Sequence, residues 1–269
     1  MIGALESALP FVAALALCAL RWMPAIALVP VFAGHALGGT ARAVIALALA
    51  WPIAPGVAAA LARAPMSAAD WIATAGKETA LGIVIACLVA APFWAIEAAG
   101  TYLDYQRGGN PQALDPAASI DASVLGAMLQ QALVVFLIHT GGLSALLDIV
   151  WTSYAVWPAL TPLPPLGPQA WGSVCDLLAS TMRFALTLAA PYLLALGAVE
   201  ASFALLSRVN AKFPAYVAAL SFKSVSLLLL IALTISGLLN ATADTAAEHF
   251  SDVQQWMRNA APDRMSVQP

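Results

Sequence analysis

Charged and polar side chains inside apolar stretches are the residues of this sequence whose types and spacing could do chemistry. Glu97 and Asp104 lie seven residues apart, which places both acids on one face of a helix. Arg107 follows Asp104 by three residues, so these two can form an ion pair. Such groups either fix the packing of helices or line a polar passage. The residue types and spacing leave both roles open for these three.

The three residues belong to the polar segment Glu97–Pro116, which separates two long apolar runs. Gly108 follows Arg107 and is typical of a residue that ends a helix, where a cation also meets the negative helix end. Asp115 and Pro116 are typical of an N-cap and the first residue of a new helix. The segment therefore predicts a capped helix, a turn and a second capped helix.

Gln130 and Asp148 are the polar residues of a further apolar run. They lie eighteen residues apart, about five turns of an unbroken helix, and Gly141 falls close to the same face. We expect this face to meet other helices or water, not lipid. Interhelical hydrogen bonding is preferred here over a proton path.

Glu200 and Lys223 flank a short basic turn that contains Arg208. In an antiparallel hairpin they would lie at similar depth, about 15 Å from the turn. An unpaired charge in hydrocarbon costs about 2.5–3.5 kcal/mol or more. Either the two side chains face each other or a shared polar lumen, or each pairs with a different helix or subunit.

The composition is that of a membrane protein: 62% of the residues are hydrophobic and 9% are charged. A soluble protein of 269 residues needs more charged residues to cover its surface. We therefore expect lipid or partner helices to cover much of the surface of this chain. The net charge of -3 and the absence of a basic run argue against nucleic acid. No metal-ligand, nucleotide-binding or nucleophile motif is present, so we expect no enzyme activity, metal or cofactor.

Six apolar runs near or above the length of a membrane span predict an all-α, multi-pass protein. Pro24 and Pro191 lie inside two of them and predict kinked or broken helices. Lys and Arg are equally numerous on the two sides of a six-span arrangement, so the positive-inside rule gives no orientation. The runs are Leu9–Ala33, Val44–Leu61, Thr79–Ala99, Val124–Trp151, Val174–Leu206 and Tyr216–Leu239.

Two further segments carry expectations of their own. Trp151–Trp171 holds five prolines and aromatic residues at both ends, which predicts a stiff connector with its aromatics at a membrane interface. In Ala241–Pro269, apolar residues at helical spacing favour a short amphipathic helix, with a frayed polar tail as the alternative.

Three ordered blocks of the sequence resemble a known family. Tyr102–Gly108, YLDYQRG, followed by Asp115-Pro116, is similar to a D-x-Q-R-G segment of the T component of type III secretion export apparatuses (the SctT/YscT/HrcT/SpaR family, homologous to flagellar FliR). Gly141–Pro158 and Leu205–Ser224 resemble two later blocks of that family, and Glu200 and Lys223 match its acid and lysine. Ala211, Pro214 and Ser221 depart from the residues that are common at these positions of the family.

The resemblance implies a function that composition does not. Such proteins are structural subunits of the export gate in the bacterial inner membrane, where they form the entry channel for secreted proteins with the R and S components, together with the U component. They pack in a spiral with homologous subunits, largely above the expected bilayer plane. On this basis residues 1–173 would be an R-like region, 174–240 an S-like hairpin and 241–269 a polar or amphipathic tail. The residue pattern and the resemblance together make Glu97, Asp104, Arg107, Asp148, Glu200, Arg208 and Lys223 candidate gate or packing residues.

A different class of function stays open on the residues alone. A secondary transporter could use Glu97, Asp148, Glu200 and Lys223 as proton or substrate sites, with breaks at prolines of the kind seen in such proteins. No inverted repeat is evident, which weakens this alternative. A polytopic membrane enzyme would need a motif that the sequence lacks.

Overall fold

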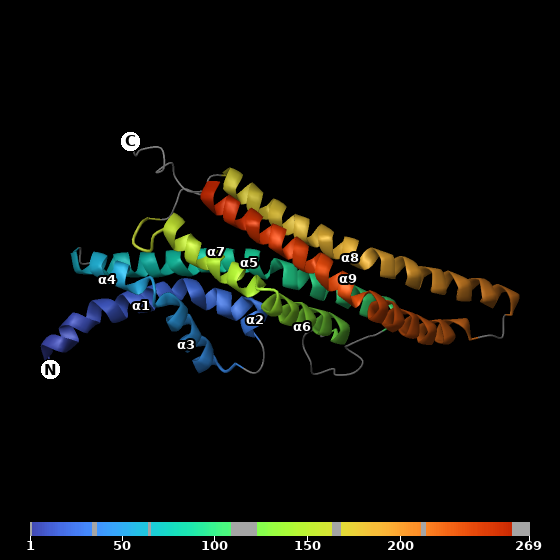
Figure 1. Cartoon of the computed structure of the whole chain (residues 1–269). Helices are drawn as coiled ribbons and strands as arrows, with labels where there is room; N and C mark the ends of the chain where they lie inside the picture. The colour runs from blue at the N-terminus through green and yellow to red at the C-terminus, as the bar shows by residue number, and fades with distance from the viewer. Residues whose placement is uncertain are drawn as a thin grey trace. The chain divides into compact units, whose positions relative to one another are not determined.

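The computed structural model describes residues 2–33, 37–63, 66–108, 123–162, 168–210 and 214–259, and within these ranges every regular element is a helix (Figure 1). This confirms the predicted all-α class. The expected N-cap Asp115 and its neighbour Pro116 lie outside the described residues. The helices are α1 Ile2–Leu28, α2 Pro30–Ala33, α3 Gly39–Ala50, α4 Ala54–Arg63, α5 Ala68–Gln106, α6 Val124–His139, α7 Gly142–Val156, α8 Pro168–Val209 and α9 Ala215–Asn259.

Two of the six apolar runs fold as bent helix pairs. The axes of α3 and α4 meet at 72°, and those of α6 and α7 meet at 83°. The second bend falls at Gly141, whose φ of +84° is a left-handed conformation that side chains with a Cβ rarely adopt. The run Val124–Trp151 is therefore two helices, and the assumption of one unbroken helix was wrong.

The breaks expected at prolines are absent from the described helices. α1 contains Pro24 and α8 contains Pro191, and both helices continue through them. A proline removes one backbone hydrogen bond, and a long helix can keep its remaining bonds on both sides. The fifth run, Val174–Leu206, thus lies within one helix of 42 residues and is not broken at its proline.

The connector and the tail also differ from expectation. α7 and α8 take up both ends of Trp151–Trp171, and Tyr154 and Trp157 are buried, so these two are not interface aromatics. Neither region boundary expected from the sequence falls at a helix end: α8 continues across residue 173 and α9 continues across residue 240. The apolar residues of the former tail do bury one face, as their spacing predicted, but they extend α9. They are Phe250, Val253, Trp256 and Met257.

The chain divides into two compact units, each with its own core. The first comprises residues 1–91, 141–177 and 247–269; there α1 packs against α3 and α4, and Trp157 meets Trp256 edge to face at 5.6 Å. The second comprises residues 92–140 and 178–246, and it holds the end of α5, all of α6 and most of α8 and α9. Helices α5, α8 and α9 each contribute to both units.

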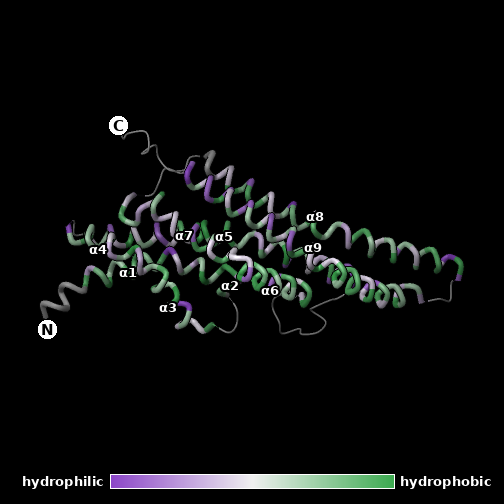
Figure 2. Tube along the Cα trace, in the orientation of Figure 1, coloured by the Kyte–Doolittle hydropathy of each residue, from purple (hydrophilic) through white to green (hydrophobic). Residues whose placement is uncertain are grey.

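Four described helices are long and apolar enough to cross a membrane, or up to six if each bent pair is one span. Their burial differs: in the most apolar window, 67% of α5 is buried, against 22% of α8 and 17% of α9. Figure 2 shows hydrophobic colouring along much of α8 and the first part of α9, with hydrophilic residues gathered near the end of α9. The α8–α9 hairpin therefore leaves most of its own apolar windows uncovered by the chain.

Candidate functional site

In the second unit, the end of α5 caps the beginning of α6. Oδ2 of buried Asp104 accepts hydrogen bonds from the Ser123 hydroxyl and, at 2.9 Å, from the Leu125 N–H. Ser123 is the N-cap of α6, and its Oγ accepts from the Gly126 N–H at 2.9 Å. The first N–H groups of a helix lack intrahelical acceptors, and the positive end of the helix dipole favours a carboxylate. Asp104 thus satisfies α6 from a different helix.

The other oxygen of Asp104 binds Arg107. Both Nε and Nη2 of Arg107 lie 2.7 Å from Oδ1, so the ion pair predicted from their spacing is confirmed. Gly108 follows with a φ of +85°, which confirms the predicted glycine stop after α5. Asp104 therefore links the last turn of one helix to the first turn of the next.

Further back along α5, Glu97 accepts a hydrogen bond from Nε2 of Gln130 on α6. The two helices approach very closely here, since a Cβ built on Gly100 would lie 2.6 Å from Cα of Gly126. The interhelical hydrogen bonding preferred for Gln130 is confirmed. It also supplies a partner for Glu97.

The α8–α9 hairpin contains the predicted ion pair. Lys223 Nζ lies 2.7 Å from Glu200 Oε2, so of the two sequence alternatives the structure shows the direct pair. Lys223 also donates to the carbonyl of Gln106 at 3.3 Å, the last residue of α5, where a cation meets free helix carbonyls. A second cross-hairpin bond joins the Tyr192 and Thr234 hydroxyls at 2.6 Å.

The remaining predicted residues do not join these clusters. Asp148 is exposed on α7, and the 83° bend between α6 and α7 removes the shared polar face proposed for it and Gln130. Arg208 is exposed in the last turn of α8. The role of all seven candidates as gate or packing residues stays a prediction.

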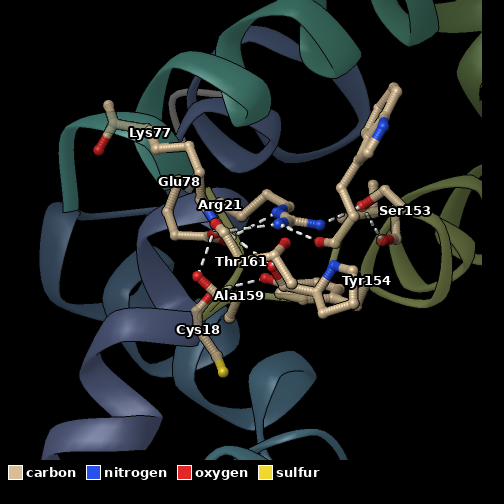
Figure 3. A network of polar contacts seen from close by, with 12 residues as sticks. Cys18, Arg21, Lys77, Glu78, Ser153, Tyr154, Ala159 and Thr161 are labelled. Atoms are coloured by element: carbon tan, nitrogen blue, oxygen red, sulfur yellow. Dashed lines mark hydrogen bonds and ion pairs between the residues drawn. The ribbon is translucent and has the colours of Figure 1, made fainter. Parts of the chain in front are cut away.

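The first unit contains a buried ion cluster, Arg21, Lys77 and Glu78, which sequence reasoning missed (Figure 3). Arg21 and Glu78 are both fully buried; Arg21 Nε and Nη2 donate to the two carboxylate oxygens at 2.8 and 3.0 Å. Arg21 also donates to Ser153 Oγ at 3.0 Å and to the Trp157 carbonyl at 2.8 Å. Its guanidinium carbon lies 4.0 Å from the centre of the Tyr154 ring.

Lys77 holds the backbone that follows α7. Its Nζ donates to the carbonyls of Pro158, Ala159 and Thr161 at 3.2, 2.6 and 2.8 Å, and lies 3.0 Å from Glu78 Oε1. The cluster has two cations and one anion, so its charge is not balanced by side chains alone. Carbonyl oxygens at the negative end of α7 offset the excess.

One more buried contact in the first unit has a local cause. Pro92 has no N–H, so the Leu88 carbonyl, four residues earlier on α5, loses its intrahelical donor. Nε2 of buried His249 on α9 lies 2.7 Å from that oxygen and, as the Nε2–H tautomer, donates to it. The histidine thus satisfies a carbonyl that the proline leaves open.

These arrangements are suited to holding helices together. In the ion cluster and at Asp104, the buried carboxylate oxygens already accept hydrogen bonds from arginine, lysine, hydroxyl or backbone groups. Among the described residues, no group of three or more His, Cys, Asp or Glu is placed to hold a metal ion. Ion pairs and caps between helices that are distant in sequence fix packing.

Comparison with known proteins gives the family. The profile described as "Bacterial export proteins, family 1" matches residues 12–249. The chain belongs to this family. It is similar to "Yop proteins translocation protein T" of Yersinia pestis, with 32% identity over 218 residues, 78% of this chain and 82% of the relative. It is also similar to "Surface presentation of antigens protein SpaR" of Salmonella typhimurium strain LT2, with 29% identity over 232 residues, 85% of each chain.

Family membership and the apolar helices both indicate a membrane protein. An export protein with four to six helices long enough to span a bilayer is a multi-pass membrane protein. "Secretion system apparatus protein SsaT" of Salmonella typhimurium strain LT2 is 30% identical over 90 residues, 33% of this chain and 35% of the relative. The resemblance to type III export components stated from three sequence blocks is thereby confirmed, and partners of this export protein belong to such an apparatus.

The ion cluster of this export protein had one sequence signal. Arg21 is a lone cation inside the first apolar run, and such a charge requires an acid or carbonyls nearby. The adjacent Lys77 and Glu78 stand at the border of the third run, where they resemble solvated loop residues. Without a hairpin to bring α1 and α5 together, sequence spacing could not pair residues 57 positions apart.

Proposed function

We propose that this chain is a structural subunit of the inner-membrane export gate of a bacterial type III secretion system. In that role it forms the entry channel for exported proteins together with the R and S components, next to the U component. The family match over residues 12–249 carries the proposal. The names of the relatives, which refer to translocation and to a secretion apparatus, support it.

The exposed apolar hairpin supports a role inside an assembly. Only 22% of α8 and 17% of α9 is buried in their most apolar windows, so the chain needs lipid or other helices around it. Residues 174–240, the proposed S-like hairpin, include most of this surface, and residues 1–173 are the proposed R-like part. The hairpin would pack in the spiral of homologous subunits.

The polar residues are proposed to serve packing in this gate. Asp104 and Arg107 bind each other and the beginning of α6, and Glu97 binds Gln130. Groups with their hydrogen bonds satisfied inside the fold are less suited to bind a passing chain. The proposal assigns the chain no catalytic residue and no cofactor.

Purification from the membrane tests this function against the secondary-transporter alternative. An affinity-tagged chain, co-expressed with the genes of its own secretion system, is expected to elute with R- and S-like proteins in a defined complex. Loss of the chain from cells should abolish secretion of that system's substrates. A chain that elutes alone and transports a small solute after reconstitution would refute the proposal.

A further inference from the structure

A pocket of about 210 Å³ opens between α8 and α9 beside the hairpin ion pair. Its lining includes both partners of that pair, Glu200 and Lys223, and the aromatic residues Phe203 and Tyr216. All of these residues belong to the second unit, so the pocket lies within one unit. It combines a charged group with aromatic walls.

The two charges of the pair are unequally covered. The Lys223 side chain is 7% exposed and already bonds Glu200 Oε2 and the Gln106 carbonyl. The Glu200 side chain is 56% exposed, and within the described part of the chain its Oε1 has no partner. The acid therefore keeps an accessible oxygen that can accept another donor.

Exposed apolar residues neighbour the pocket-lining residues along α8 and α9. Leu205, Val209 and Val217 lie within two positions of a lining residue in sequence and are 62%, 87% and 64% exposed. Exposure of these side chains to water is unfavourable, and lipid tails would leave Glu200 Oε1 without a donor. An apolar helix that carries one cation covers the side chains and satisfies the acid together.

We propose that this pocket receives a Lys or Arg side chain from an apolar helix of a partner subunit, with Glu200 as its acceptor. A cation would complement the unpartnered carboxylate oxygen of Glu200, and the pocket lining includes the aromatic residues Phe203 and Tyr216, a residue type that attracts cations. The contact rests on the proposed function because a helical membrane partner must be present. Beyond that function, the contact would let the α8–α9 hairpin distinguish its partner by a basic residue on an apolar helix.

Photo-cross-linking in the full chain within its own apparatus tests the contact. p-Benzoylphenylalanine, a photoreactive aromatic residue, replaces Tyr216 on the pocket wall or, as a control, the exposed Leu229, which does not line the pocket. The Tyr216 probe is expected to link to an apolar peptide that contains Lys or Arg. Glu200→Lys should reduce that product at least fivefold and leave the Leu229 product unchanged. An acidic residue in place of the partner's cation should restore it.

Several results separate this contact from the broader function. If Glu200→Lys prevents assembly, Glu200→Gln is used and should reduce the Tyr216 product at least threefold with the complex intact. The proposed contact is overturned if the Tyr216 probe links to lipid or to a peptide that lacks a basic residue. It is also overturned if the yield of the Tyr216 product is unchanged in an intact Glu200→Gln complex. Failure of the unmodified chain to copurify with any apparatus component refutes the proposed function instead.

Discussion

The buried ion cluster gives the sharpest prediction, through the substitution Glu78→Gln. Glu78 is the single acid between Arg21 and Lys77, and it accepts from Arg21 through both oxygens. Glutamine has almost the same shape, but it is neutral, and its amide group would present a donor to a cation. Removal of one partner from a buried ion pair costs about 3–5 kcal/mol. We expect a loss of that size in the free energy of unfolding.

Thermal unfolding of the purified protein in detergent, followed by tryptophan fluorescence, measures this loss. At about 2–4 °C per kcal/mol, Tm should fall by about 6–20 °C. Asp148→Asn is the matched control, because it removes one negative charge from an exposed position on α7. It should leave Tm within about 2 °C of the unmodified protein, as surface substitutions usually do.

A double variant tests the cause. In Arg21→Gln with Glu78→Gln, both members of the bidentate pair become neutral, while Lys77 keeps its three backbone carbonyls. The double variant should be less destabilised than the sum of the two single variants by about 0.5–3 kcal/mol. Strictly additive losses, or equal losses in Glu78→Gln and the Asp148→Asn control, would refute the ion-pair reasoning.

Three other substitutions probe contacts within single units. Gly126→Ala should destabilise the protein by about 1–3 kcal/mol, because its Cβ would lie 2.7 Å from a carbonyl oxygen of α5. Gly197→Ala is the control, because a Cβ there has open space and should not destabilise. Equal thermal stabilities of the two variants would contradict the close approach of α5 and α6. Asp104→Asn should speed hydrogen exchange of the first amides of α6, and unchanged exchange would show that the carboxylate does not cap it. His249→Phe should lower the free energy of unfolding by about 1–3 kcal/mol by leaving a buried carbonyl unpaired, and an unchanged Tm would argue against that bond.

The helical elements were predictable to the extent that apolar length defines them. Each of the six runs corresponds to a long helix or a bent pair, because a helix satisfies its own backbone in an apolar setting. The ends of helices in polar sequence were harder to predict. α9 continues nineteen residues past Asn240, because its buried face repeats beyond the end of the apolar run. A local average of hydropathy loses that narrow stripe.

Some contacts of the candidate site were also predictable from the sequence, and others were not. Asp104 with Arg107 follows from helix spacing, and Glu200 with Lys223 follows from hairpin symmetry, so both pairs were within reach. Asp104 also caps α6 through Leu125, and that contact depends on a close approach of two helices which no local rule specifies. Tertiary packing therefore decides the partners that are not fixed by one helix or one tight turn.

The distribution of burial bears on why this chain functions in an assembly. α5 is two-thirds buried in its most apolar window, and both polar clusters use it: Glu78 near its beginning and Asp104 at its end. The α8–α9 hairpin has the opposite character, with long exposed apolar faces and a half-exposed acid at Glu200. Exposed apolar surface of this extent is unfavourable in water and marks a face that other molecules cover. The ion pairs and caps thus stabilise α5 among its own neighbours, while the hairpin remains available for lipid or partner helices.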